Sequence, residues 1–513
     1  MNQLLVQVGV LGGYLLVALG VGLLAYRLTA DTAEDYYLAG RTLGTVVLLF
    51  TTFATLLSAF TFFGGPNLAY SAGPEWILVM GLMDGVLFAL LWYVVGYKQW
   101  LVGRRGGYVT LGEMLGDRFG STLLRLVVAG VSVFWLFPYV MLQQKGAGQA
   151  LVGLTDGAVP FWVGAGGITL FMVVYVVVSG MCGVAWTDTL QGAFMLVLVW
   201  GAVAWVLSAV GGAGEATAAL AGSNPEFLRL GGGLYSPEWM ISTAVSIAFG
   251  VTMFPQINQR FFAARSKTVL KRTFALWPVL VVLLFVPAFM LGSWAVGLGV
   301  QVPEGGNVVP ALLNEYTPAW FAALVIAGAL AAMMSSSDSM LLSGASYLTR
   351  DLYPTARLVH RRSMAVLEGE SPSAVDAGSE RDPAEGREAL VGRIGVAVFA
   401  VLSFIASLYA PGTLVEIGNT AFGGFAQLAL PVIVALYWPR TTRTGMLAGV
   451  TGSQAFYLAS VFVPLVPGSY LGGWSASVVG MGLGLVLTVG VSLVTTPAVE
   501  EDRTVYFGGL RAD

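Results

Sequence analysis

The sequence is dominated by runs of about 20 apolar residues, the length that an α-helix needs to cross the hydrocarbon core of a bilayer. Thirteen such runs follow one another along the 513 residues. They fall at 4–25, 44–72, 77–98, 120–152, 159–179, 184–211, 237–257, 273–299, 318–349, 390–410, 414–438, 443–465 and 472–495. Charged residues make up 10% of the chain, against about 25% in soluble domains. We therefore expect an all-α integral membrane protein with thirteen transmembrane helices.

The basic residues predict how these spans are oriented, because Lys and Arg are retained on the cytoplasmic side. With the N-terminus outside, every Lys and Arg except Arg229 and Lys145 falls in a cytoplasmic segment or at a span end that borders one. Thirteen spans then place the C-terminus inside. The first run lacks a basic leader and a small-residue cleavage site, so we expect a permanent span and a multi-pass protein of the cell membrane.

The polar segments divide the chain into one large domain and two appendages. We expect residues 1–495 to form a single transmembrane domain, followed by a cytoplasmic tail at 497–513. The connection at 351–389 mixes Glu and Asp with Ser, Pro and Gly, a composition typical of a flexible loop. We interpret it as a solvated acidic cytoplasmic loop, with a regulatory contact surface as the alternative.

The composition argues against several classes of function. A net charge of −3 gives no field that would recruit nucleic acid. One cysteine, Cys182, and one histidine, His360, exclude a disulfide framework and a Cys/His metal cluster. The chain also has no GxSxG, HExxH or P-loop spacing, so we do not expect an enzyme. We expect it to work as a monomer.

Two spans contain residues that interrupt helices. The second carries Gly-Gly-Pro at 64–66, and the seventh carries Gly250 and Pro255. Paired interruptions at corresponding positions of two halves indicate a transporter with inverted repeats and a binding site near the membrane midplane. The repeats would be spans 2 to 6, at 44–211, and spans 7 to 11, at 237–438. A chance coincidence among the many glycines is the alternative.

The ninth span carries polar side chains at membrane depth. Helical spacing puts Ala332, Ser335, Ser336 and Ser339 on one face, and Asp338 lies among them. A carboxylate there costs roughly 2.5 to 3.5 kcal/mol and needs a cation, a proton or a partner. Sodium prefers oxygen ligands, which serines and the carbonyls of a broken helix supply. We therefore expect a sodium site between spans 2 and 9, although serines also serve close helix packing.

Six motifs in order along nearly the whole chain resemble the sodium:solute symporter family, whose members carry proline, pantothenate, sialic acid, monocarboxylates and sugars. The motifs are DYYLAGRTLG at 35–44, SAFTFFGGPNLAYSAG at 58–73, SGMCGVAWTDTLQG at 179–192, FPQINQRFFAARS at 254–266, AAMMSSSDSMLLSGASYLTRDLY at 331–353 and AFGGFAQLALPVIVALYWPRTTRTG at 421–445. The resemblance implies Na+ as the coupling ion and a five-plus-five inverted repeat of the kind first recognised in a bacterial leucine transporter, here called the LeuT fold.

The resemblance also implies the residues that bind ions. The sodium ligands would be the main-chain oxygens of Ala54, Leu57 and Ala332 and the side chains of Ser335 and Ser336. A further sodium site of some members would fall on Asp188, Ser335, Asp338 and Ser339. Asp338 departs from the family pattern. The resemblance implies a serine at this position in the relatives that have the further sodium site. Two nearby carboxylates could share a proton and couple protons to the cycle, or Asp338 could belong to a structural ion pair.

The solute is expected at the interrupted parts of spans 2 and 7. Family correspondence implies contacts from Ser58, Phe60, Thr61, Phe62, Gln256, Phe422 and Gln427, although the aromatic residues could serve packing alone. Two further charges lie within spans, Asp84 and Lys145. Lys145 could receive a substrate carboxylate, neutralise Asp84 or extend toward the outer surface.

The function expected from these residues is sodium-coupled symport of a small organic solute, with a monocarboxylate or similar anion favoured. The alternatives within the same class are a proline-like amino acid, pantothenate or a sugar. A solute sensor and a passive channel are the alternatives of other classes.

Overall fold

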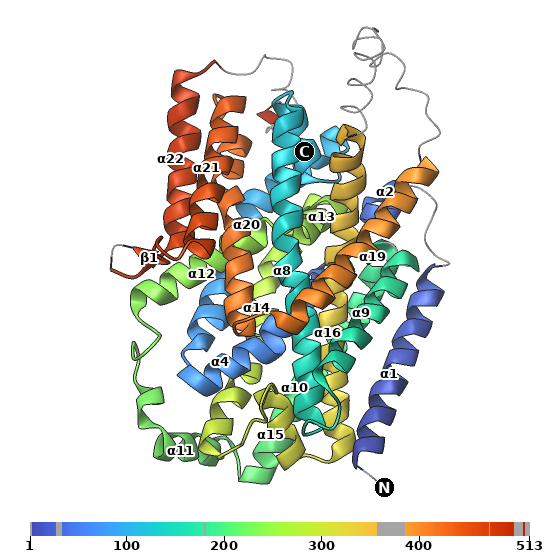
Figure 1. Cartoon of the computed structure of the whole chain (residues 1–513), viewed down its shortest axis with the longest axis vertical. Coiled ribbons are helices and arrows are strands. Elements are labelled where there is room, and N and C mark those ends of the chain that lie inside the picture. Colours follow the sequence, from blue (N-terminus) through green and yellow to red (C-terminus); the bar gives the residue numbers. More distant parts are fainter. Residues whose placement is uncertain are drawn as a thin grey trace.

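The computed structural model describes residues 3–26, 33–178, 181–356, 385–470, 472–496 and 506–507. Nearly all of these residues are helical (Figure 1). One short antiparallel hairpin is present among them, formed by β1 (Ser469–Tyr470) and β2 (Trp474–Ser475). Helices suit a bilayer because each satisfies its own backbone hydrogen bonds where no water is present.

The helices of the first half begin at α1 (Gln3–Tyr26) and end at α10 (Met181–Val210). Between them lie α2 (Ala33–Leu38), η1 (Ala39–Arg41), α3 (Thr45–Leu56), η2 (Phe60–Gly64), α4 (Gly65–Ala72), η3 (Ile77–Met83), α5 (Asp84–Leu91), η4 (Trp92–Gly96), α6 (Tyr97–Gly106), α7 (Leu111–Arg118), α8 (Thr122–Leu154) and α9 (Phe161–Val178).

The second half begins with α11 (Ala213–Ser223). It continues with η5 (Pro225–Leu228), α12 (Pro237–Thr252), α13 (Pro255–Ala263), α14 (Lys267–Gly297), α15 (Val308–Tyr316), α16 (Ala319–Ser346), η6 (Tyr347–Leu352), α19 (Glu385–Tyr409), α20 (Leu414–Tyr437), α21 (Arg443–Phe462) and α22 (Ala476–Val494).

Each of the thirteen predicted apolar runs contains helix among its described residues. Within the described residues, nine helices are long and apolar enough to cross a membrane, or up to eleven if each of two bent pairs is one span. The expected runs at 159–179 and 443–465 form α9 and α21. The helix α16 lies at the centre, because 83% of its apolar window is buried.

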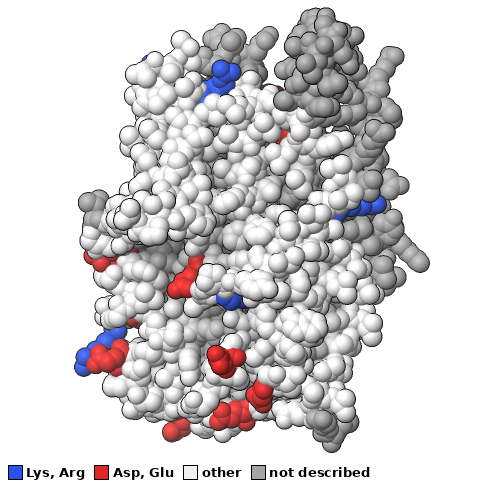
Figure 2. Space-filling model, viewed as in Figure 1, with Lys and Arg blue, Asp and Glu red and all other residues white. Residues whose placement is uncertain are grey.

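The outer face of the helices is apolar. Leu16 of α1, Leu170 of α9 and Val197 of α10 each expose more than half of their surface, which suits contact with lipid. Figure 2 shows few charged side chains on the drawn face, with acidic ones gathered at the lower end, where α11 and α15 lie. Glu215 and Glu315 are exposed acidic residues of these two helices.

The second span is interrupted, but not at the Gly-Gly-Pro sequence. The helix α3 ends at Leu56, and the chain bends by 61° before the next helical segment begins at Phe60. Leu57 has an extended backbone. The helix then runs on through Gly64, Gly65 and Pro66. Gly65 is needed for packing, because a Cβ atom there would collide with the ring of Phe289 on α14.

The seventh span is interrupted where its sequence predicts. The helix α12 ends at Thr252, α13 begins at Pro255, and the two are bent by 54°. Proline is tolerated at the first position of a helix, since the N–H that it lacks has no partner there. Both broken spans therefore place backbone groups in the interior of the protein that have no partner in a regular helix.

Two glycines bring helix backbones into direct contact. A Cβ atom at Gly250 of α12 would collide with the carbonyl group of Phe422 on α20. A Cβ atom at Gly292 of α14 would collide with the carbonyl group of Pro66 on α4. Small residues permit this closeness between membrane helices. One half-helix of each broken span, α12 and α4, thus packs tightly on one unbroken helix.

The loop and the tail are described in part. The predicted loop at 351–389 is shorter at both ends, because helix continues through residue 356 and α19 begins at Glu385. The rest of that loop, including His360, lies outside the described residues. In the tail, Lys98 donates to the main-chain oxygen of Tyr506 at 2.6 Å, and Arg118 lies over the rings of Tyr506 and Phe507. Burial raises the pKa of the Tyr506 hydroxyl well above its ordinary value.

Candidate functional site

The break after α3 directs main-chain oxygens toward α16. A helix that ends leaves its last carbonyls without N–H partners four residues on. The hydroxyl of Ser336 on α16 lies 2.9 Å from the main-chain oxygen of Thr55 and 2.5 Å from that of Leu57. All three residues are buried. Two carbonyl oxygens and one hydroxyl oxygen therefore converge at the break.

The same three oxygens could hold a monovalent cation. The Ser336 hydroxyl has one proton, which it donates to one carbonyl or shares between both, and a bound cation would not compete for a second proton. A small cation such as Na+ would attract all three oxygens at once, by the preference of hard cations for oxygen ligands.

The other predicted sodium ligands are buried beside this point. Ala54 and Ala332 have no exposed surface and lie on α3 and α16. Ser335 is turned toward α10, where its hydroxyl donates to Asp188 Oδ1 at 2.6 Å. The structure thus brings Leu57 and Ser336 into contact and joins Ser335 to the residues of the predicted second site.

The predicted second site forms a cluster of oxygens around Asp188. The hydroxyl of Thr51 donates to Asp188 Oδ2 at 2.6 Å, and the hydroxyls of Thr55 and Ser339 lie 2.9 Å apart. A positive side chain occupies this cluster. The terminal nitrogen of Arg260 lies 3.0 Å from Asp188 Oδ2, and both side chains are essentially inaccessible to solvent.

Arg260 is a functional candidate that the sequence analysis missed. Its position in the charge pattern assigned it to the cytoplasmic end of a span, but it is fully buried in α13. The sequence feature that could have identified Arg260 is its spacing from Gln256, a predicted solute contact. Arg260 follows Gln256 by four residues, so a helix that starts at Pro255 places both on one face.

Asp338 is separate from this cluster. The carboxylate is nearly buried, and within the described residues its Oδ1 atom has no hydrogen-bond partner. It is in electrostatic range of Tyr14 on α1 and of Asp188 on α10. A shared proton and a structural ion pair would each need a partner in direct contact with the Asp338 carboxylate. No hydrogen bond or ion pair of this carboxylate is found among the described residues.

Aromatic side chains from η2, α8, α20 and the joint between α12 and α13 gather at the two breaks. The ring of Phe422 on α20 lies 5.1 Å from Phe60, 5.2 Å from Tyr139 and 5.5 Å from Phe254, between ring centroids. The hydroxyls of Ser58 and Tyr139 lie 3.0 Å apart. The breaks therefore meet around one aromatic cluster, defined by Phe60, Tyr139, Phe254 and Phe422.

Amide side chains lie at the same breaks. Gln143 of α8 accepts a hydrogen bond from the main-chain N–H of Ala59 at 2.8 Å. Gln256 is fully buried at the start of α13, and neither atom of its amide group has a hydrogen-bond partner among the described residues. A buried amide without partners costs free energy unless a ligand satisfies it. Tyr139, Gln143 and Phe254 were not predicted, because only the folded arrangement brings them to the breaks.

The remaining solute candidates lie differently. Thr61 and Phe62 are buried in η2. The amide of Gln427 donates to the main-chain oxygens of Gly423 at 2.8 Å and Ser477 at 3.1 Å, which joins α20 to α22. Lys145 donates to the main-chain oxygens of Ala410 and Gly412, at 2.9 Å and 2.5 Å. The NH2 group of Gln427 and the ammonium group of Lys145 therefore already have structural partners, whereas the amide oxygen of Gln427 is buried without a hydrogen-bond partner among the described residues.

Lys145 does not neutralise Asp84. The Asp84 side chain is fully buried, and neither carboxylate oxygen has a hydrogen-bond partner among the described residues. Among the described residues, neither Asp84 nor Lys145 forms an ion pair. Of the three alternatives for Lys145, neutralisation of Asp84 therefore has no contact to support it, and Lys145 is held by the connection between α19 and α20.

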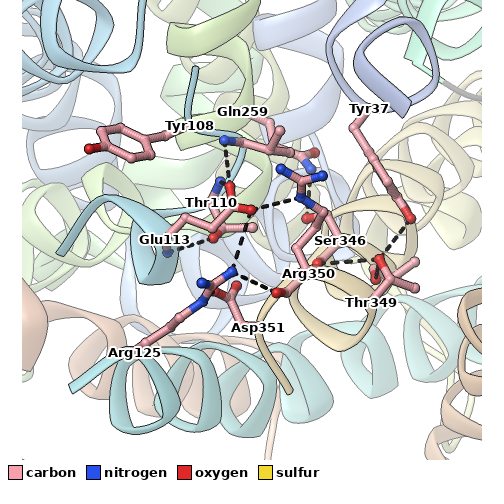
Figure 3. A network of polar contacts seen from close by, with 12 residues as sticks. Tyr37, Tyr108, Thr110, Glu113, Arg125, Gln259, Ser346, Thr349, Arg350 and Asp351 are labelled. Carbon is pink, nitrogen blue, oxygen red and sulfur yellow. Dashed lines mark hydrogen bonds and ion pairs between the residues drawn. The ribbon is translucent and has the colours of Figure 1, made fainter. Parts of the chain in front are cut away.

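A second polar network lies where α16 passes into η6 (Figure 3). Arg350 Nε lies 2.7 Å from Glu113 Oε1, and Arg125 Nε lies 2.6 Å from Asp351 Oδ1. Arg125 also donates to the main-chain oxygen of Arg350 at 2.6 Å. These contacts connect α7 and α8 of the first predicted repeat to η6 of the second.

Comparison with known proteins identifies a matching family and several proteins of similar sequence. The model of the sodium:solute symporter family matches residues 36–368. The sodium/pantothenate symporter of Escherichia coli is 27% identical, over 88% of this chain and 92% of its own. The sodium/proline symporter of Haemophilus influenzae is 28% identical, over 85% of this chain and 84% of its own.

Two solved structures share the fold. A Na+-coupled sialic acid symporter, in a substrate-bound outward-open state, matches 96% of this chain and 99% of its own, with a TM-score of 0.77 and 20% identity. A nucleobase-cation-symport-1 family transporter matches 93% of this chain with a TM-score of 0.55 and 16% identity.

Proposed function

The chain belongs to the sodium:solute symporter family, as its motifs predict, and from this premise we propose how it performs sodium-coupled symport. It is a multi-pass membrane protein whose coupling ion is Na+. We propose thirteen spans with the N-terminus outside, and inverted repeats at 44–211 and 237–438 that together expose the solute site to each side of the membrane in turn. The pairing of two bent spans five apart supports this arrangement.

The contact of Ser336 with the broken span carries the proposal. Sodium would bind the main-chain oxygens at the end of α3, including Leu57, and the hydroxyl of Ser336 on α16. Ala54, Ala332 and Ser335 complete the proposed ligand set from the same two helices. The bound ion would thus hold a broken helix against the most enclosed helix of the protein.

The residues proposed to contact the solute come immediately after a proposed sodium ligand in the sequence. Leu57 would bind sodium, Ser58 lies beside Tyr139, and the N–H of Ala59 is bound by Gln143. Sodium that orders this segment therefore also orders the groups that would face the solute. Such coupling is reciprocal, so the solute raises the affinity for sodium by the same factor.

We propose a small carboxylate as the solute. Gln256 supplies an unpaired amide, Ser58 supplies a hydroxyl, and the aromatic cluster supplies an apolar surface. Pantothenate and proline, for which two similar proteins are named, both carry a carboxylate. Neutral donors would bind this group, because Lys145 is already bonded to two carbonyl oxygens. A proline-like amino acid, pantothenate and a sugar are the alternatives to a simple monocarboxylate.

Uptake into proteoliposomes under an imposed sodium gradient tests the proposal. A panel of radiolabelled monocarboxylates, amino acids, pantothenate and sugars would be offered with sodium, potassium or choline outside. We expect accumulation of one carboxylate with sodium alone. Each sodium ion that moves down the membrane potential adds about 2.3 kcal/mol per 100 mV.

The same experiment separates the alternatives. Uptake that is equal in sodium, potassium and choline would refute sodium coupling. Equilibration without accumulation would identify a passive channel, and sodium-dependent binding without uptake would identify a sensor.

A further inference from the structure

Asp84 is a carboxyl group within a span that the proposed transport function does not use. It is the first residue of α5, and its side chain has no exposed surface. Among the described residues, neither of its oxygen atoms has a hydrogen-bond partner and no charged side chain is in electrostatic range of it. A carboxylate at membrane depth needs a cation, a proton or a partner. Asp84 therefore needs a ligand that its surroundings do not supply.

Aromatic contacts on both sides of this carboxyl group show its depth in the protein. At the start of the same span, the ring of Trp76 lies 6.1 Å from that of Phe60, which follows the break in span 2. One turn after the carboxyl group, the ring of Phe88 lies 6.1 Å from that of Trp277. The Trp277 ring in turn lies 6.1 Å from that of Phe53, which precedes the break. The carboxyl group therefore lies at the depth of the break, where the solute is proposed to bind.

The elements around Asp84 offer it no counter-charge. The helix α5 continues η3 and leads into η4, and it packs against α12 and α14. Met80 and Phe88, one turn before and after Asp84, are buried and apolar. A carboxyl group in such surroundings is cheapest in its neutral form, which a bound proton provides. Apart from Asp84, these elements carry the following titratable side chains, none of which is in electrostatic range of it: Glu238, Lys267, Lys271, Arg272 and Tyr93.

A proton suits this site better than a metal ion does. Hard metal cations take several oxygen ligands. No hydroxyl or amide group of the described residues donates to Asp84, and no group of three or more acidic, His or Cys side chains gathers among them. A proton needs only one carboxyl oxygen, with which it forms an O–H bond.

We propose that Asp84 is a proton-binding site and that the carrier changes conformation only while Asp84 holds a proton. The inference rests on the proposed function, in which the solute site opens to each side of the membrane in turn. In an open conformation the carboxylate takes its proton from water and returns it to water. An ionised Asp84 then resists being enclosed by α12 and α14. The proton is held in both directions of the cycle, so sodium remains the ion that drives uptake.

Infrared spectroscopy of the purified protein in lipid vesicles tests whether Asp84 holds a proton. A protonated carboxyl group has a C=O stretching band that a carboxylate lacks. At neutral pH we expect a band of this kind in the wild-type protein that is missing from Asp84→Asn. Asp156→Asn is the matched control and should keep the band, because Asp156 is exposed and its positive φ is one that Asn tolerates. Identical bands in all three proteins would overturn the inference, whether or not transport depends on sodium.

Solute exchange in proteoliposomes, with saturating sodium on both sides, tests whether the proton is required. As the pH rises through the alkaline range, we expect the wild-type exchange rate to fall, toward about tenfold per pH unit, because the protonated fraction falls by that factor. Asp84→Asn carries a neutral amide of the same shape, so its rate should be the same at neutral and alkaline pH. Asp156→Asn should follow the wild-type protein.

The outcomes separate this inference from the proposed function. A wild-type rate that does not fall at alkaline pH, or an Asp84→Asn rate that falls as the wild-type rate does, would overturn the proton site and leave sodium coupling intact. Uptake that does not require sodium would instead refute the proposed function. If Asp84→Asn does not fold, Asp84→Leu, which is also neutral and of similar size, replaces it in both measurements.

Discussion

The hydroxyl oxygen of Ser336 lies 2.5 Å from the main-chain oxygen of Leu57, across 279 positions of sequence. The contact exists because α3 ends one residue earlier and leaves its carbonyls directed at α16. It joins the two predicted repeats at the point where a sodium ion is proposed.

Replacing Ser336 tests this contact. Ser336→Ala removes one proposed ligand, so we expect the sodium concentration for half-maximal uptake to rise about tenfold, equivalent to about 1.4 kcal/mol. Ser337→Ala is the matched control, because its hydroxyl bonds one turn back to Met333 at 2.6 Å. An unaltered sodium dependence in Ser336→Ala would count against Ser336 as a ligand.

Replacing Gln256 tests the solute site. The buried amide has no partner among the described residues, so Gln256→Leu should not lower the thermal stability of the protein without solute. We expect the affinity for solute to fall about tenfold, because a hydrogen bond to the solute is lost. Binding assays with and without solute and a thermal melt measure both effects. Unchanged solute affinity would remove Gln256 from the site.

Replacing Lys145 separates a structural role from solute binding. Lys145→Met removes two hydrogen bonds to the connection between α19 and α20, which should cost about 2 kcal/mol of stability. We expect it to affect transport of a carboxylate and of its neutral amide equally. Selective loss of carboxylate transport would instead indicate direct contact between Lys145 and the solute.

Replacing Arg350 tests the network in Figure 3. Arg350→Gln removes the ion pair with Glu113 but keeps the cap of α7, which uses the other carboxylate oxygen of Glu113. We expect hydrogen exchange in 111–118 and 347–352 to increase about fivefold, equivalent to about 1 kcal/mol. Arg229→Gln breaks an exposed pair elsewhere and should leave these segments unchanged. Equal exchange in both variants would mean that the ion pair between Arg350 and Glu113 does not stabilise these two segments.

Apolar length and helix breakers in the sequence predict the helices and the seventh-span break, because these features depend on local chemistry. Gly65 was misread as a breaker, since its packing against Phe289 is a tertiary contact that the local sequence does not reveal. The adjacency of Leu57 and Ser336 followed from family resemblance and is present in the structure.

Side-chain direction was the part that could not be predicted. The rule that Lys and Arg lie on the cytoplasmic side uses only the position of Arg260 in the sequence. The direction of its side chain, toward the protein interior, depends on the bend between α12 and α13. Tyr139 and Gln143 likewise lie on a long regular helix, and only the crossing of α8 with the breaks brings them to the proposed solute site.

The glycine contacts limit which parts of the protein can separate during a transport cycle. Because the backbone of α12 rests on that of α20 at Gly250, and α14 rests on α4 at Gly292, neither pair can slide without a steric clash. Each pair should travel as one rigid body. The torsional change of alternating access is then confined to the short joints between Leu56 and Phe60 and between Thr252 and Pro255, where no helix resists rotation.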